Sequence, residues 1–255
     1  MDGNWISPEW QAPNNVGALS TTRKGGVSTG PYGDASGKDG LNLGLHVEDD
    51  ADYVRRNRAL LRAELPSEPA WLNQVHGNTV VDAALVSAPV DADASVTTQP
   101  GVVCAVQTAD CLPVLFCDSG GKVVGAAHAG WRGLASGVLE NTVRRMRDAG
   151  AENILAWLGP AIGPSRFEVG QDVFDAFAGQ DPAAARAFKA AQTTPRKYLA
   201  DIYLLARQRL ERQGVVQVSG GGFCTVSDSE RFYSFRRDRV TGRMASLIWL
   251  KHAAR

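Results

Sequence analysis

The sequence predicts one domain of the α/β (α+β) class, in which a mixed, mostly antiparallel β-sheet is flanked by α-helices. A chain of 255 residues is long enough to bury a sizeable core in one large domain. Hydrophobic residues make up 44% and charged residues 21% of the chain, which is ordinary for a globular protein. Segments with strand-like patterns outnumber those with helical patterns, and the two kinds are interspersed, as in a mixed fold.

The first third of the chain begins with a predicted strand over residues 16–22, followed by a long irregular loop from 24 to 44 that carries seven glycines. Residues 49–65 begin with aspartates suited to capping and continue with spaced leucines, which predicts an amphipathic helix. Residues 71–83, "WLNQVHGNTVVDA", predict two strands that are joined by a tight turn at Gly77 and Asn78.

The middle of the chain carries three apolar strand patterns, over residues 101–108, 111–117 and 122–128. The intervening "DSGG" predicts a hairpin between the last two of them. A helix that ends at a glycine is expected over 133–150, and a strand over 152–160.

The last third predicts three helices followed by strands near the C-terminus. The helices are expected over 170–178, 182–192 and 198–213, and the strands over 215–220 and 243–250, with 231–235 as a further strand beside them.

The charge balance argues against a general nucleic-acid or anionic-membrane surface, because Lys plus Arg and Asp plus Glu each number 27. The longest nearly unbroken apolar run, "CLPVLFC", is far shorter than a membrane span. The first ten residues carry neither a basic start nor an apolar core of a signal peptide. We therefore expect a cytoplasmic protein that binds neither nucleic acid nor membrane, with monomer and homodimer both left open.

Three residues at the ends of predicted strands form a candidate metal site: His76, Cys111 and His128. The predicted hairpin brings Cys111 close to His128 by connectivity alone, because the start of one antiparallel strand lies opposite the end of the next. The approach of His76 to this pair is a hypothesis. Two imidazoles and a thiolate are a ligand set that suits catalytic zinc, with one position left for water or substrate. Each histidine on its own equally fits a core or surface role.

The other cysteines fit simpler roles. Cys104 and Cys117 lie in apolar strand patterns and are expected to be small buried residues. The four cysteines form no C-x-x-C pair, which excludes a four-cysteine zinc ribbon. Among the remaining histidines, we interpret His46 as orienting the glycine-rich loop and His252 as solvated.

Five separated motifs resemble the YfiH family: "TTRKGGVS", "NQVHG", "TADCLPV", "HAGWRG" and "FYSFRRDRVTGR". This family has also been labelled a multicopper polyphenol oxidase or laccase-domain family, and peptidoglycan editing factor. The resemblance covers nearly the whole chain and implies a single YfiH-like domain over 1–255, of the cysteine-hydrolase type. It implies a zinc site, in which copper is possible, from His76, Cys111 and His128. It also implies phosphorolysis of adenosine, inosine, guanosine and methylthioadenosine, with some adenosine deaminase activity.

If the activity is phosphorolysis, phosphate and purine nucleoside are the small-molecule partners, and basic and aromatic residues are needed to hold them. Arg23 in "TTRKGGVS" is a candidate for phosphate, although a solvated basic turn fits this motif equally well. Tyr233, Arg237 and Arg243 lie in "FYSFRRDRVTGR". If residues 231–235 form a strand, Tyr233 and Arg237 share one face, and one face of that strand belongs to the core.

Three further residues are candidates for substrate contact beside the expected metal ligands. Gln74 would share a strand face with His76. Asp110 precedes Cys111 and is suited either to orienting a ligand or to capping a turn. Arg132 stands at an expected helix start, where it opposes the helix dipole, so a functional role is favoured over a salt bridge.

The histidines and cysteines of the chain also limit two alternative activities, multicopper oxidation and nucleobase deamination. If His76 and His128 serve one copper centre, only His46 and His252 remain, too few for a separate oxygen-reducing copper cluster. The deaminase zinc site needs an H-x-E motif followed by P-C-x-x-C, and no P-C-x-x-C occurs in the sequence, so the motif pair of nucleobase deaminases is incomplete. Two alternatives stay open: an amidase that edits peptidoglycan precursors through Cys111 or a zinc-bound hydroxide, and a non-catalytic metal- or nucleoside-binding protein.

Overall fold

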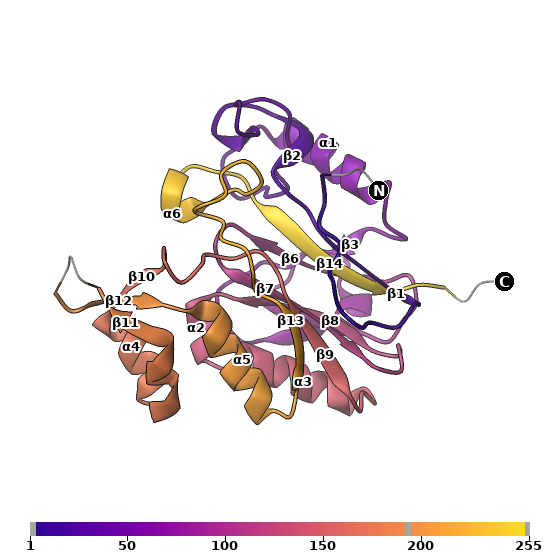
Figure 1. Ribbon diagram of the computed structural model, residues 1–255. Helices are drawn as coiled ribbons and strands as arrows, with labels where there is room; N and C mark the ends of the chain where they lie inside the picture. Colours follow the sequence, from indigo (N-terminus) through magenta and orange to yellow (C-terminus); the bar gives the residue numbers. More distant parts are fainter. Residues whose placement is uncertain (1–3, 192–194, 253–255) are drawn as a thin grey trace.

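Two β-sheets packed face to face form the centre of the computed structural model, which describes residues 4–191 and 195–252 (Figure 1). The smaller of the two has the order β1 (Val16–Ser20), β14 (Met244–Leu250), β6 (Val103–Thr108) and β3 (Pro69–Ala70). The larger has the order β13 (Gln217–Gly220), β9 (Ile154–Leu158), β7 (Leu112–Asp118), β8 (Val124–Ala129), β5 (Ala94–Thr97) and β4 (Val80–Asp82).

Most neighbouring strands run antiparallel, and the exceptions are β3 with β6, β4 with β5, and β13 with β9. This confirms the mixed, mostly antiparallel class. The expectation of one sheet is corrected, because the strands are divided among these two sheets and a small third one. The small sheet has the order β10 (Glu168–Gly170), β12 (Lys197–Ala200) and β11 (Phe188–Ala190).

Helices cover the outer faces of both central sheets, so the molecule has four layers (Figure 1). Helix α1 (Ala51–Arg62) packs on the four-stranded sheet. Helices α2 (Trp131–Ala135), α3 (Val138–Asp148) and α5 (Ile202–Arg212) cover the six-stranded sheet. The remaining elements are strand β2 (Lys24–Ser28), helices α4 (Gln171–Ala178) and α6 (Phe235–Asp238), and short 3-10 helices at Gly30–Tyr32, Ala83–Leu85 and Pro182–Ala187.

The layer between the two sheets is apolar and contains Cys104 and Cys117, which are both fully buried. Burial raises the pKa of each of these two thiols to about 12. Their surroundings confirm the prediction that both are small core residues. Within the described residues, no helix combines the length and the apolar character that crossing a bilayer would require.

Three helix predictions need correction. The helix expected over 198–213 begins only at Ile202, because residues 197–200 form strand β12. The helix expected over 133–150 is interrupted after α2, where Gly137 adopts a left-handed conformation (φ 94°) before α3 begins. Gly150 follows the helix with φ 95°, in agreement with the expected glycine terminus. The helix expected over 182–192 is a 3-10 helix followed by strand β11, and residue 192 lies outside the described residues.

Two strand predictions are wrong, both for reasons of local hydrogen bonding. The strand expected from residue 71 to His76 does not form, because the N–H groups of residues 75–77 donate to the carboxylate of Asp93 instead of a neighbouring strand. The strand expected over 231–235 is replaced by a turn and helix α6. Ser234 caps this helix by accepting a hydrogen bond from the N–H of Arg237 at 3.2 Å.

Candidate metal centre and pocket

The hairpin of β7 and β8 carries two of the three predicted ligands to one end of the six-stranded sheet. Cys111 directly precedes β7, and His128 is the second-last residue of β8. In the strand register Leu112 faces Ala129 and Pro113 faces His128, so the two ligands are close neighbours. The prediction that connectivity alone brings Cys111 to His128 is confirmed.

His76 reaches the same place from the loop that precedes β4. Its Nε2 atom lies 3.8 Å from Sγ of Cys111, and its ring meets the ring of His128 edge to face, with centroids 4.9 Å apart. One ligand atom from each of the three residues lies within 4.8 Å of the other two. In the described ranges, no other grouping of three or more His, Cys, Asp or Glu residues has this spacing.

A buried carboxylate, Asp93, holds both histidines in place. Its Oδ1 atom accepts hydrogen bonds from Nδ1 of His128 at 2.8 Å and from the N–H of His76 at 3.0 Å. Its Oδ2 atom accepts from the N–H of Gly77 at 2.6 Å and of Val75 at 3.2 Å. The fixed Nδ1 leaves Nε2 of His128 to face Cys111, an arrangement in which carboxylates orient metal-binding histidines.

Asp93 was missed in the sequence, where it is one of two aspartates in "VDADAS". The only signal was an acidic residue directly before a strand of small residues, which is commonplace. Burial opposes ionisation of Asp93, but the hydrogen bonds from His128 and the backbone lower the pKa of its carboxyl below the usual value.

The electrostatics of the cluster favour a thiolate beside a charged imidazole. Burial alone would raise the pKa of the Cys111 thiol, but His128 and His76 lower it to about 6. Burial alone would lower the pKa of His128, but Cys111 and Asp93 raise it to about 9. Cys111 therefore carries the ionised sulfur that a metal ligand or nucleophile needs, in contrast to Cys104 and Cys117.

The residues fit a metal ion by donor type and by the space around them. Thiolate and imidazole donors suit zinc, and copper accepts the same set. A Cβ atom added at Gly130 would lie 3.0 Å from Cδ2 of His76 and 3.1 Å from Sγ of Cys111. Glycine at this position therefore keeps the space beside the ligand atoms clear.

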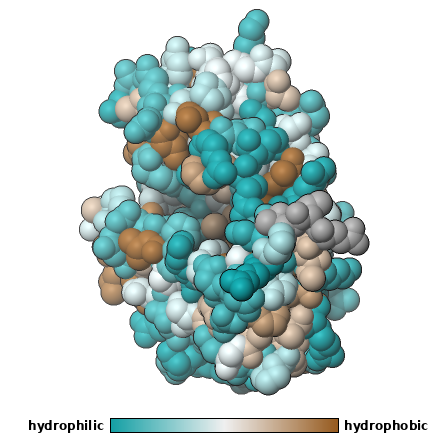
Figure 2. Space-filling view, turned by 90° about the vertical axis from the view of Figure 1, so that its left-hand side faces the viewer, coloured by the Kyte–Doolittle hydropathy of each residue, from teal (hydrophilic) through white to brown (hydrophobic). Residues whose placement is uncertain are grey.

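The cluster lines a cavity of about 320 Å³, at the small end of the range for ligand pockets. The walls include His46, Gln74, Phe235 and Arg243, together with polar and small residues from the end of β6. Figure 2 looks onto the side of the molecule that carries α6 and α4, and this face is hollowed at mid-height.

Of the predicted substrate residues, the structure brings Gln74 and Arg243 to this pocket. The side-chain amide of Gln74 is already occupied, since it donates to the carbonyl of Gln107 at 2.8 Å and accepts from its N–H at 2.7 Å. Gln74 therefore ties the His76 loop to β6. Arg243 keeps two guanidinium donors, Nε and Nη2, without a partner in the described residues.

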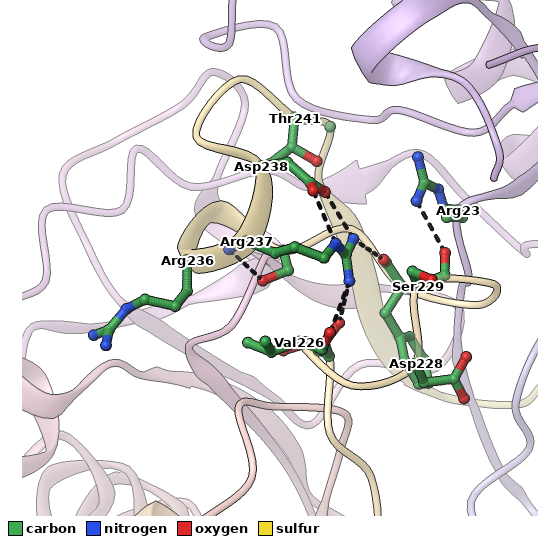
Figure 3. A network of polar contacts seen from close by, with 12 residues as sticks. Arg23, Val226, Asp228, Ser229, Arg236, Arg237, Asp238 and Thr241 are labelled. Atoms are coloured by element: carbon green, nitrogen blue, oxygen red, sulfur yellow. Dashed lines mark hydrogen bonds and ion pairs between the residues drawn. The ribbon is translucent and has the colours of Figure 1, made fainter. Parts of the chain in front are cut away.

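Three other candidates, Arg237, Arg23 and Tyr233, donate mainly to backbone carbonyls away from this pocket, and Figure 3 shows the two arginines. Arg237 donates to the carbonyls of Thr225, Val226 and Phe232 and pairs with Asp238. Arg23 donates to the carbonyls of Gly33 and Ser229. Tyr233 is fully buried and donates to the carbonyl of Tyr32. None of these three side chains lines the pocket of the cluster, and their donors instead connect neighbouring loop segments.

Asp110 and Arg132 flank the site without lining the pocket. The carboxylate of Asp110 accepts from Oγ1 of Thr225 and from the N–H of Arg236, both at 2.6 Å. It thereby joins the turn before Cys111 to helix α6. Arg132 is exposed and stacks over Trp131, with its guanidinium 4.6 Å from the ring centre.

The two remaining histidines differ in their surroundings. His252 is exposed, as predicted, whereas His46 lines the pocket that contains the cluster. Its sequence context, "LNLGL" in a glycine-rich loop, indicated only a role in orienting that loop.

Comparison with known proteins agrees with the motifs. The profile of the family described as multi-copper polyphenol oxidoreductase laccase matches residues 17–251. The Escherichia coli (strain K12) protein named purine nucleoside phosphorylase YfiH is 55% identical over 250 residues, which cover 96% of this chain and 98% of that one. A Pseudomonas aeruginosa protein named purine nucleoside phosphorylase is 54% identical over 247 residues, with 97% and 98% covered.

The same relation holds among solved structures. The crystal structure of Neisseria meningitidis protein NMB0706, titled as DUF152, superposes with a TM-score of 0.90 at 52% identity, with 98% of this chain and 100% of that chain covered. The profile match, the two relatives and this structural neighbour agree with one another over nearly the whole chain. The chain therefore belongs to the YfiH (DUF152) family, whose profile is described as multi-copper polyphenol oxidoreductase laccase.

Proposed function

We propose that this chain is a zinc-dependent purine nucleoside phosphorylase. Its substrates would be adenosine, inosine, guanosine or methylthioadenosine, which inorganic phosphate converts to the free base and ribose 1-phosphate or methylthioribose 1-phosphate. The observation that carries the proposal is a single pocket in which His76, Cys111 and His128 converge beside an arginine and a partly exposed aromatic ring. The relatives named purine nucleoside phosphorylase support the same assignment.

The roles of the residues follow from their positions. His76, Cys111 and His128 would hold the metal through Nε2, Sγ and Nε2, and Asp93 would keep the imidazole of His128 in the required tautomer. When bound, zinc supplies a Lewis acid and a fixed positive charge in the pocket, and copper is the alternative ion. The three ligand residues are also the proposed catalytic residues, because a substrate in this cavity contacts them.

The reaction needs phosphate and nucleoside to be held together while water is limited. A phosphate oxygen forms a bond to C1′ of the ribose as the bond from C1′ to the purine nitrogen breaks, and the electron pair moves to the purine. A cavity of about 320 Å³ leaves little room for bulk water beside a bound nucleoside. The exposed ring of Phe235 offers an apolar surface for a planar base.

Product analysis with purified, zinc-loaded protein tests the proposal. Inosine is incubated over a range of phosphate concentrations, and hypoxanthine and ribose 1-phosphate are measured. We expect base release only with phosphate, in equal amount to the sugar phosphate, and none from Cys111→Ala protein. An unchanged rate without phosphate would identify a hydrolase and overturn the proposal. The same assay with adenosine measures the deaminase side activity as inosine formation.

A second candidate is an amidase that edits peptidoglycan precursors. The observation that favours it is the chain of contacts from Cys111 to His128 to Asp93, since a thiolate beside an oriented imidazole is suited to acyl transfer. This activity would require water and no phosphate. Release of an amino acid from a nucleotide-linked muramyl precursor, with no base release from nucleosides, would favour it over phosphorolysis.

A further inference from the structure

The pocket of the candidate metal centre has a positive character that the three ligands do not explain. Its walls contain the side chains of Arg243 and His46, whereas no Asp or Glu of the described residues lines it. Arg243 also forms no ion pair within the described residues. The negative charges that act on this partly buried guanidinium, on Cys111 and Asp110, make no direct ion pair with it, so an anionic ligand in the pocket would supply a counter-charge at closer range.

The hydrogen bonds of Arg243 leave part of its guanidinium available. Nη1 donates to the carbonyls of Thr241 and Gly242, both at 3.1 Å, while Nε and Nη2 have no partner in the described part of the chain. Arg237 and Arg23 differ in this respect, because their donors are occupied by backbone carbonyls and, for Arg237, by Asp238. Of these three arginines, Arg243 is therefore the one prepared for an external acceptor.

The surrounding charges reinforce this preference. Partial burial in the pocket wall, together with the positive charges of Arg243 and Arg58, lowers the pKa of His46, although much of the side chain stays exposed. Arg58 is fixed nearby, because its Nε donates to the carbonyl of Leu43 at 2.9 Å and its guanidinium stacks 4.3 Å from the ring centre of Trp71. The nearby carboxylate of Asp110 is already engaged by Thr225 and Arg236.

The side chain of Arg243 is aimed by one short segment, residues 42–46, which also carries His46. The N–H of Arg243 donates to Oδ1 of Asn42 at 2.8 Å, and the N–H of Leu43 donates to the carbonyl of Arg243 at 3.1 Å. A Cβ at Gly44 would lie only 2.8 Å from Cγ of Arg243, so the arginine stem packs directly on the glycine. This packing restricts the guanidinium before any ligand arrives, which reduces the entropy lost on binding.

We propose that Arg243 and His46 form the phosphate subsite of this pocket, with the free Nε and Nη2 of Arg243 donating to phosphate oxygens. A guanidinium is matched in shape and charge to a tetrahedral oxyanion, and the imidazole adds a further donor. The inference rests on the proposed phosphorolysis, in which inorganic phosphate is the attacking substrate. The diphosphate of a nucleotide presents the same oxygens, so the experiment has to separate the two sources.

The test measures binding of inorganic phosphate to the zinc-loaded protein by calorimetric titration without nucleoside, and the phosphate and inosine KM values in the turnover assay. We expect Arg243→Gln to weaken phosphate binding by about tenfold or more, as expected for the loss of charge-assisted hydrogen bonds. The inosine KM should change far less. Arg243→Lys should lie between wild type and Arg243→Gln, since it keeps the charge and loses the planar fork.

Two further variants test whether weaker phosphate binding results from misfolding of the protein. His46→Gln removes an exposed side chain and should weaken phosphate binding without loss of thermal stability. Arg236→Gln is the matched control, because its guanidinium donates to the carbonyl of Glu168 at 2.8 Å and points away from the network around Arg237 (Figure 3). It removes the same charge from the neighbourhood and should leave phosphate binding unchanged.

The outcomes separate this inference from the proposed function. Wild-type phosphate affinity in Arg243→Gln would overturn the subsite, whatever the enzyme's activity. Phosphate binding that depends on Arg243, in a wild-type protein that does not cleave nucleosides, would support the subsite and refute phosphorolysis. Arg243-dependent binding of uridine diphosphate without measurable binding of inorganic phosphate would overturn the assignment to inorganic phosphate.

Discussion

The role of Asp93 can be tested by Asp93→Asn, which changes the charge of the side chain and almost nothing of its shape. The two carboxylate oxygens accept four hydrogen bonds, two on each oxygen, from His128 and from the N–H groups of residues 75–77. An amide replaces one of these oxygens by an NH2 group, so two of the four donors lose their acceptor whichever way the amide turns. A fully buried donor left without a partner costs about 1–3 kcal/mol, and the three backbone donors are only partly buried, so the lower part of this range applies to them.

The expected loss of folding free energy is therefore about 2–4 kcal/mol for the metal-free protein. For a chain of this size, this corresponds to a decrease in Tm of roughly 5 to 15 °C. Zinc affinity should also fall, by about 10- to 100-fold, because the imidazole of His128 is no longer oriented by a carboxylate. Thermal unfolding of the metal-free protein and competition titration with a zinc indicator measure these two quantities separately.

Asp91→Asn is a suitable control, because Asp91 stands two residues earlier and its carboxylate is exposed, where it contacts Asn73. It should leave Tm and zinc affinity within the error of the wild-type values. Wild-type zinc affinity in Asp93→Asn would refute the idea that this carboxylate organises the cluster. A lower Tm with unchanged zinc affinity would restrict Asp93 to a folding role.

Three further predictions concern the cluster itself. Cys111→Ala should abolish zinc binding and turnover, with little change in the Tm of the metal-free protein. Cys104→Ala should keep its specific activity and lose about 1 kcal/mol of folding free energy through lost packing. Equal losses of activity in the two variants, at matched folded fraction, would contradict the separate roles of the two cysteines. Gly130→Ala should weaken zinc binding several-fold, measured by the same titration, because its Cβ would lie 3.0 Å from His76. Removal of metal by a chelator should lower Tm and stop turnover, both restored by zinc, since zinc at about 1,000 times its Kd adds about 4 kcal/mol; unchanged turnover in verified metal-free protein would exclude a catalytic metal.

The sequence predicted the three residues of the candidate metal site by two arguments of unequal strength. The hairpin fixed the neighbourhood of Cys111 and His128, because a short turn between two apolar strands leaves one antiparallel register. His76 lies 35 residues before Cys111, and only the family motifs joined it to the pair. Neither argument could identify Asp93, because its carboxylate accepts hydrogen bonds from backbone N–H groups and an imidazole nitrogen, and no sequence pattern marks such contacts.

The substrate residues were harder to predict, because an arginine has the same appearance in a sequence whether its donors are free or occupied. Arg23, Arg237 and Arg243 all lie in basic motifs, and only the fold shows which carbonyls surround them. The predicted alternation of residues 231–235 failed because the side chain of Ser234 caps a helix, a local interaction that overrides strand propensity.

Backbone strain beside the ligands explains why the cluster depends on partners that are distant in sequence. His76 and Asp110 both have positive φ, 60° and 93°, although neither is a glycine, and Asp110 directly precedes Cys111. Such conformations cost about 1–3 kcal/mol each and persist only where other contacts hold them. Asp93 supplies those contacts for the His76 loop, and Thr225 with the N–H of Arg236 supplies them for Asp110. The strained turns direct His76 and Cys111 toward one point. The geometry of the site therefore depends on the carboxylates of Asp93 and Asp110, which hold these turns, as much as on the ligands themselves.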